Sequence, residues 1–150
     1  VLDQEGSYTA GDGGETIIGT SEEDILSGGA GDDYIWAGAG DDLLVGGTGN
    51  DLLEGEAGND IFLYAAGDGS DTVHGGAGWT DTIELHGMDG AVIIDGLTVT
   101  GQGWTMELDA GSSIDSHAGE TLNFSADTHG SITFDDGSIM TFTDIEKVTW

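Results

Sequence analysis

The sequence contains no cysteine, no proline and only one basic residue, Lys147, among its 150 residues. Without cysteine the chain has no disulfides, no thiol redox chemistry and no sulfur ligands for zinc. Without proline, its 29 glycines do not fit a collagen-like or low-complexity linker. No apolar run approaches the ~20 residues that a membrane span needs, and no basic and apolar leader is visible at the N-terminus.

The near-absence of basic residues leaves 30 acidic residues unbalanced, so the formal net charge is −29. Nucleic acid and anionic membrane would both repel such a chain, which excludes them as partners. The partners that remain are cations and neutral molecules. Disorder fits poorly, because 37% of the residues are hydrophobic and they recur at regular spacing.

A nine-residue repeat runs through the first half of the chain. Residues 28–63 read GGAGDDYIW, AGAGDDLLV, GGTGNDLLE and GEAGNDIFL. Each unit has Gly or Ala at position 1, Gly at position 4, Asp at position 6 and a large apolar residue at position 8. Weaker copies on both sides extend the pattern to eight units over residues 10–84. Tyr64 and Ala65 interrupt the register, and the last unit carries one extra residue, Thr80.

The second half reads as antiparallel β-structure. Residues 91–100 contain an Asp-Gly pair typical of a tight hairpin, and residues 131–142 form a second hairpin candidate. Residues 104–109 and 120–124 alternate like strands, and no amphipathic helix is evident. We therefore expect an all-β fold, with a repeat region at 1–84 and a capping region at 85–150 that form one structural unit.

Within each repeat, we expect positions 1 to 6 to form a turn and positions 7 to 9 to form a short strand. Glycines allow backbone conformations that a Cβ would forbid. Position 8 is expected to face inward, since side chains alternate along a strand. The inward set is Ile17, Leu26, Ile35, Leu44, Leu53, Phe62, Val73 and Ile83. One apolar residue in nine makes a thin core.

The aspartates at position 6 require a cation. Two units make one full coil, so residues 18 apart stack at about 4.8 Å, the spacing of β-strands. Asp33 then lies over Asp51, and Asp42 over Asp60. Like charges at ~5 Å repel by about 3 kcal/mol at an effective dielectric near 20. Such a row is either a cation site or a fold breaker, and oxygen ligands in a flexible glycine turn suit calcium better than magnesium or zinc.

The unit GGAGDDYIW and its neighbours resemble the RTX, or haemolysin-type, calcium-binding nonapeptide G-G-x-G-x-D-x-U-x. The resemblance implies a right-handed parallel β-roll over residues ~10–84, followed here by an antiparallel β cap. In this family the carbonyls of positions 2 and 4 and the position-6 carboxylate of one unit bind calcium. Carbonyls of positions 1 and 3 and the position-6 carboxylate two units later complete the site.

Carried over to this sequence, the resemblance implies about five calcium ions. One would be held by Gly29, Gly31, Asp33, Gly46, Thr48 and Asp51; a second by Gly38, Gly40, Asp42, Gly55, Ala57 and Asp60; a third by Gly47, Gly49, Asp51, Ala66, Asp68 and Asp71. Weaker candidates join 19–24 to 37–42 and 55–60 to 75–81, the latter with Glu56 in place of a glycine. The remaining residues of the predicted set are Asp24, Gly28, Ala30, Ala37, Ala39, Gly58, Gly75, Ala77 and Asp81.

Positions 7 and 9 predict the outer faces of the roll. One sheet would expose a contiguous apolar strip, which is rarely left facing water. The strip is Ile25, Leu43, Val45, Ile61 and Leu63. We expect the 85–150 region to pack on this strip. The other sheet would present Tyr34, Trp36 and Leu52.

These features indicate a calcium-binding module, without catalytic residues or another cofactor, that is part of a larger bacterial protein. The resemblance implies secretion through the type I machinery and folding on extracellular calcium. Two alternatives stay open: an adhesive or carbohydrate-binding module that uses Tyr34 and Trp36, and an accessory domain of an extracellular enzyme. No HExxH motif occurs, and the four histidines are scattered.

Overall fold

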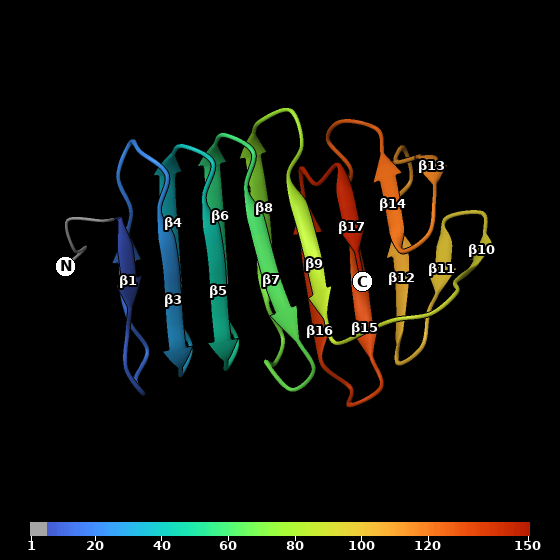
Figure 1. Cartoon of the computed structure of the whole chain (residues 1–150). Coiled ribbons are helices and arrows are strands. Elements are labelled where there is room, and N and C mark those ends of the chain that lie inside the picture. The colour runs from blue at the N-terminus through green and yellow to red at the C-terminus, as the bar shows by residue number, and fades with distance from the viewer. Residues whose placement is uncertain (1–5) are drawn as a thin grey trace.

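The computed structural model describes residues 6–150, which contain strands and turns but no helix (Figure 1). The expected all-β class is confirmed. Since the described part of the chain has no helix, it has none long and apolar enough to cross a membrane. The strands form two sheets, one of eight and one of nine strands, that face each other along a flattened solenoid.

Nine strands from the first half of the chain alternate between the two sheets. They are β1 (Ser7–Thr9), β2 (Thr16–Ile18), β3 (Ile25–Ala30), β4 (Tyr34–Ala39), β5 (Leu43–Thr48), β6 (Leu52–Ala57), β7 (Ile61–Ala65), β8 (Thr72–Ala77) and β9 (Thr82–His86). The odd-numbered strands pair in parallel in one sheet, and the even-numbered strands in the other. This is the parallel β-roll that the repeat predicted.

The register of the roll follows the nine-residue period. Leu26 pairs with Leu44, and Ile35 with Leu53, so each coil spans two repeats. The strands are longer than expected, because they continue through positions 1 to 3 of the next unit. Gly29 pairs with Gly47 inside the ladder, so half of the segment predicted as turn is strand.

All eight predicted inward residues are buried, with 0–3% of each side chain exposed. Tyr8 on β1 pairs with Leu26 and adds a half coil that the repeat pattern did not reveal. Position 1 also faces inward, and it is always Gly or Ala in the regular coils. The interior is therefore narrow, filled by one large side chain per half coil.

The interruption at Tyr64 widens this interior. Tyr64 occupies the inward place where neighbouring coils have a small position-1 residue, and Leu85 does the same in β9. The Tyr64 ring stacks on Phe134, with 4.3 Å between ring centroids. Its hydroxyl donates to the Gly69 carbonyl and contacts Ser138 Oγ. The insertion thus joins the thin core of the roll to the larger core of the second half.

Eight further strands form the second half: β10 (Ile93–Asp95), β11 (Thr98–Thr100), β12 (Trp104–Leu108), β13 (Ile114–His117), β14 (Thr121–Phe124), β15 (Gly130–Phe134), β16 (Ile139–Thr143) and β17 (Lys147–Thr149). Both expected hairpins, β10–β11 and β15–β16, are confirmed. The first turns at Gly96 and Leu97, one residue later than the sequence suggested. Strand β13 was not expected.

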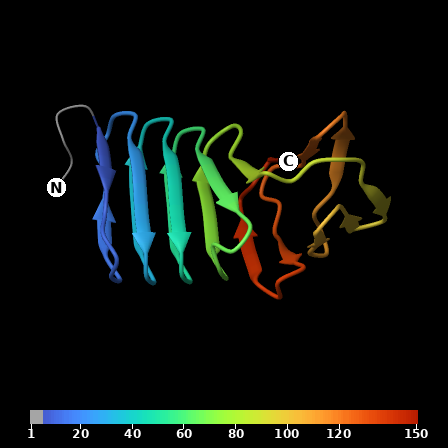
Figure 2. The same cartoon turned by 60° about the horizontal axis from the view of Figure 1, so that its bottom comes forward.

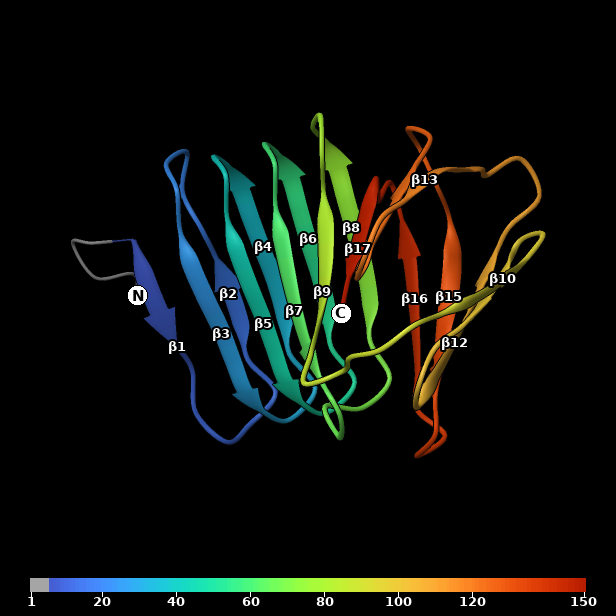
Figure 3. The same ribbon diagram turned by 45° about the vertical axis from the view of Figure 1, so that its right-hand side comes forward.

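The last two strands return to the roll. Strand β16 pairs in parallel with β8, and β17 pairs in parallel with β9. The other strands of the second half then extend both sheets by antiparallel pairing. The second half therefore lies beyond β8 and β9, at the end of the roll away from the N-terminus (Figures 1 and 3).

The expected packing of residues 85–150 on the outer apolar strip is wrong. Figure 2 shows these residues continuing the long axis of the roll, and the outer face of β3, β5 and β7 is left uncovered. Ile25 is 54% exposed and Ile61 40% exposed, while Leu43, Val45 and Leu63 are half-buried by their neighbours. Capping is achieved through sheet edges, because the end coil has two open strands, β8 and β9, whose backbone groups need partners.

Candidate metal sites

Position 6 forms two columns of buried acids, one along each side of the roll. The first column is Asp33, Asp51 and Asp71, and the second is Asp24, Asp42, Asp60 and Asp81. In each column, one carboxylate oxygen accepts the backbone N–H of the acid one coil earlier. Asp51 Oδ1 accepts from Asp33 N at 2.8 Å, and Asp60 Oδ1 accepts from Asp42 N at 2.9 Å. This ladder fixes the orientation of every column carboxylate except that of Asp24.

The second carboxylate oxygen of most column members has no hydrogen-bond partner. It is Oδ2 in five buried residues, namely Asp33, Asp42, Asp51, Asp60 and Asp81. Asp24 is reversed: its Oδ2 accepts from Thr20, and its Oδ1 is the atom without a partner. A buried anionic oxygen without a partner is costly. A cation next to each oxygen would supply the missing partner.

The small residue at position 1 brings a carbonyl to the same place. A Cβ added at Gly28 would lie 2.6 Å from the Gly46 carbonyl and would collide with Asp33 Oδ2. A Cβ at Gly55 would meet the Gly75 carbonyl at 2.7 Å and collide with Asp60 Oδ2. At both turns a carboxylate from one coil and a carbonyl from the next lie together in a space that only a small residue leaves open.

Glycines at positions 2 and 4 hold the backbone in left-handed conformations. Gly29 and Gly31 have φ values of 102° and 113°, and a Cβ on either would collide with the backbone of the preceding coil. Glu56 takes position 2 of its unit with φ of 78°, a conformation that is strained for a non-glycine residue. The glycine pattern therefore serves to stack carbonyl-bearing turns closely.

Burial raises the pKa of five column carboxylates, those of Asp42, Asp51, Asp60, Asp71 and Asp81. Desolvation is the main cause, and nearby acids add to it. The pKa of Asp51 and of Asp81 rises to about 6, and that of Asp60 and of Asp71 to about 7. The backbone N–H that each carboxylate accepts opposes the shift only in part. The two columns thus have a strong electrostatic demand for positive charge.

Side chains alone do not make these sites. Within residues 6–150, no group of three or more His, Asp or Glu side chains converges on one point as a metal cage. Each candidate site instead combines two carboxylates with backbone carbonyls. Such an all-oxygen set on turns of adjustable geometry fits calcium, which accepts six to eight oxygen ligands.

The five predicted sites differ in how well the turns align. The turns 28–33 and 46–51 stack in register, as do 37–42 and 55–60. The turn 66–71 departs from them because the Tyr64 insertion shifts its first residues. The atoms nearest a Cβ on Gly46 all belong to Asp51, with no carbonyl of the next coil among them. Predicted ligand Ala66 lies on an exposed turn.

Asp68 has a local role in that turn. Its Oδ2 accepts the backbone N–H of Ala65 at 2.7 Å, while its carbonyl accepts from Gly49 N at 2.6 Å. The same pairing joins Thr48 to Gly31 and Ala57 to Gly40, so the Asp68 carbonyl makes the hydrogen bond of the other position-3 residues. The side chain closes the turn instead of facing the column.

Several aromatic and histidine side chains lie apart from the columns. Tyr34 donates its hydroxyl to Glu54 at 2.6 Å, and Trp36 lies half-buried on the same outer face. His74 contacts Thr143 Oγ1 at 2.6 Å between β8 and β16. Trp79 stands 90% exposed in the turn before Asp81. These side chains therefore lie on the sheet surface or in a turn, away from the aspartate columns.

Comparison with known families agrees with this geometry. Residues 9–44, 36–68 and 64–79 match the model of the RTX calcium-binding nonapeptide repeat, which comprises four copies. Residues 9–79 are an RTX calcium-binding region. No curated protein matched the chain. RTX repeats bind calcium, so this roll is a structural calcium-binding module.

Proposed function

We propose that this RTX module is a calcium-triggered folding unit of a secreted bacterial protein. The observation that carries the proposal is the set of buried aspartate oxygens without a hydrogen-bond partner. In a metal-free roll these atoms oppose folding, and bound calcium removes the penalty. A module of this kind stays extended where calcium is scarce and folds where it is abundant.

The proposed ions lie between successive turns on each side of the roll, about five in all. Each takes a position-6 carboxylate from two coils and carbonyls from positions 1 to 4. The turns at 28–33 with 46–51 and at 37–42 with 55–60 are the strongest candidates, since their registers are unbroken. The site that includes turn 66–71 is expected to bind more weakly, because its position-1 carbonyl is displaced.

The repeat region 1–84 and the region 85–150 act in this proposal as one structural unit, although residues 1–5 lie outside the described chain. The support is the parallel pairing of β16 with β8 and of β17 with β9. Calcium that orders the roll therefore also orders the edges on which the second half is built. Export through the type I machinery before folding is the setting that such a switch serves.

The test is a calcium titration of the full chain, followed by small-angle X-ray scattering. The unfolded 150-residue chain has an expected radius of gyration of ~40 Å, and the compact chain roughly 15–20 Å. The proposal predicts compaction with a midpoint near ~0.1–1 mM, the range of extracellular calcium modules. Magnesium is the control ion, and equal compaction by magnesium, or a midpoint at submicromolar calcium, contradicts the proposal.

A further inference from the structure

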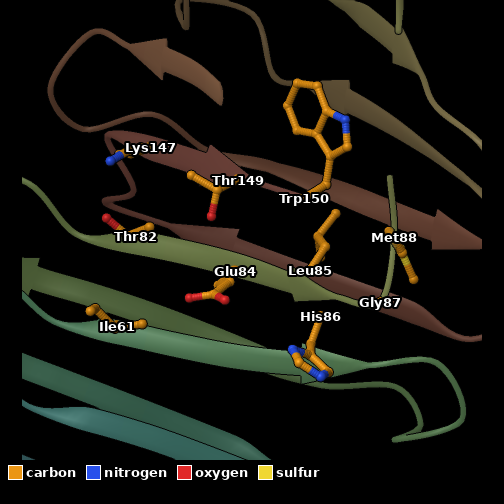
Figure 4. A pocket seen from close by; sticks show the side chains of 10 residues that line it. All are labelled: Ile61, Thr82, Glu84, Leu85, His86, Gly87, Met88, Lys147, Thr149 and Trp150. Atoms are coloured by element: carbon orange, nitrogen blue, oxygen red, sulfur yellow. The ribbon is translucent and has the colours of Figure 1, made fainter. Parts of the chain in front are cut away.

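The second aspartate column does not end with the repeats. Beyond Asp81 the chain leaves the roll and returns as β17, which pairs in parallel with β9. Thr82 pairs with Lys147, and Glu84 with Thr149; Figure 4 shows each pair side by side on the outer face of the two strands. The residue before Lys147 is Glu146, so an acid takes the register place one coil beyond Asp81.

Glu146 makes the hydrogen bond of a column member. Its Oε2 accepts the backbone N–H of Asp81 at 2.8 Å. In the same way, Asp81 Oδ1 accepts from Asp60 N at 2.9 Å, one coil earlier. A non-repeat glutamate therefore continues the ladder that orients the repeat aspartates.

A carbonyl also takes the expected place. A Cβ added at Gly75 would collide with the Asp144 carbonyl and lie 2.8 Å from Asp81 Oδ2. This reproduces the pattern at Gly55, where the neighbours are the Gly75 carbonyl and Asp60 Oδ2. The Asp144 carbonyl thus stands where the regular coils present their position-1 carbonyl.

The third observation is an unpartnered oxygen between these groups. Asp81 is 1% exposed, and its Oδ2 has no hydrogen-bond partner. The oxygen faces the same space beside Gly75 as the Asp144 carbonyl. This buried atom is independent of the acidity of the surrounding surface, and it points to a ligand at this end of the column.

We propose a further calcium site between turn 75–81 and residues 144–146. Its ligands are the carboxylates of Asp81 and Glu146 and the carbonyl of Asp144, with the carbonyls of Gly76 and Gly78 in positions 2 and 4. The inference rests on the calcium-binding function proposed above. It extends that function to residues outside the repeats, which no nonapeptide pattern identifies.

The closing segment is shorter than a repeat turn. Thr143 pairs with His74 and Lys147 with Thr82, so the three residues 144–146 lie opposite the seven residues 75–81 of the last repeat. No residue corresponds to position 3, so water completes the coordination and this ion binds more weakly than those between regular coils. Because residues 144–146 lie between the two returning strands, this ion fastens the C-terminal strands to the last repeat.

The test counts calcium ions bound to the full chain by equilibrium dialysis at a concentration that saturates the wild type. Glu146→Gln keeps a side-chain acceptor for Asp81 N–H but removes the charge, and it should bind one ion fewer. Glu84→Gln is the matched control, because Glu84 is exposed on the neighbouring strand; it should keep the full number. An unchanged count in Glu146→Gln overturns the inference.

A second measurement does not depend on variants. Crystals of the wild-type chain grown with terbium should show an anomalous peak beside Asp81 Oδ2 and the Asp144 carbonyl, in addition to peaks between the repeat turns. Peaks between repeat turns without one here refute the further site and leave the proposed function intact. A chain that takes up no calcium and shows no peak at all refutes the proposed function itself.

Discussion

Replacing Asp60 by Asn should change stability in opposite directions with and without calcium. Asp60 is fully buried, its Oδ1 accepts from Asp42 N, and its Oδ2 has no partner. Asparagine has the same shape and keeps an oxygen for Asp42 N–H. Its amide nitrogen can donate to the Gly75 carbonyl, which lies in the same space beside Gly55.

The size of the effect follows from the pKa. Burial, opposed by the Asp42 N–H and reinforced by Asp81 and Asp42, raises the pKa of Asp60 from 3.8 to about 7. A shift of roughly three units corresponds to about 4 kcal/mol against the metal-free folded state above pH 7. Side-chain relaxation and entry of water reduce this, so a gain of ~2 kcal/mol is expected for Asp60→Asn in chelator at pH 8.

The sign of the pH dependence is a separate check. A carboxyl whose pKa is raised by folding binds its proton more tightly in the folded chain, so its penalty is absent below pH ~4. The penalty grows as pH rises from ~4 through about 7 and is complete above that value. Metal-free wild type should therefore gain stability on acidification from pH 8 to pH 5, and Asp60→Asn should respond less.

The assay follows circular dichroism. Because the metal-free chain starts unfolded, the folding osmolyte trimethylamine N-oxide is titrated in chelator at pH 8 and pH 5, and a more stable variant folds at a lower osmolyte concentration. In saturating calcium at pH 8 the titrant is urea. With calcium, the variant loses a charged ligand from two proposed sites, so its calcium midpoint should rise by at least ~10-fold. The reasoning is refuted if Asp60→Asn destabilises the metal-free chain at pH 8, or if its calcium midpoint equals that of the wild type.

Three other substitutions, the first with a matched control, test the packing of the roll. Gly49→Ala should destabilise by several kcal/mol, because φ is 141° and the new Cβ strikes Gly31; Gly87→Ala, with φ of 78° but open space, should lose only ~1 kcal/mol. Glu56→Gly should raise the urea midpoint with a gain of ~1 kcal/mol, since it relieves a left-handed non-glycine residue; an unchanged midpoint would argue against strain there. Leu44→Ala in calcium should cost about 2–5 kcal/mol, since Leu44 is fully buried, and a loss below ~1 kcal/mol would mean that the interior is loosely packed.

The regular part of the fold was predictable from the repeat because period and structure coincide there. Position 8 has one apolar residue in each unit, and a strand has only two faces, so the inward set followed directly. The aspartate columns followed from the 18-residue coil. The strand bounds did not, because glycine-rich residues such as Gly28 and Gly29 read as turn although their backbone continues the parallel ladder.

The end of the roll was not predictable in the same way. Thr141 pairs with Thr72, 69 residues earlier, and nothing in the local sequence of β16 specifies a parallel partner so distant. The antiparallel hairpin with β15 was readable because its turn is local. The apolar strip led us to expect that residues 85–150 cover the outer face. The need to pair the open edges of β8 and β9 proved stronger, and the sequence does not show which strands form an edge.

The candidate metal sites were likewise predictable only in part from the sequence. Spacing identified the ligand positions within unbroken repeats, but the displacement at turn 66–71 depends on how Tyr64 enters the core. The role of Glu146 depends on β17 returning beside β9. Neither residue belongs to a nonapeptide, so only the assembled fold relates them to the columns.

The central claim is that calcium between the coils is what makes this chain fold. Far-UV circular dichroism of the full chain at pH 8, in excess chelator and after addition of millimolar calcium, tests it most directly. The account predicts an unfolded spectrum in chelator and a β-sheet spectrum that returns with calcium and not with magnesium. A β-sheet spectrum that is the same in chelator and in calcium would contradict it.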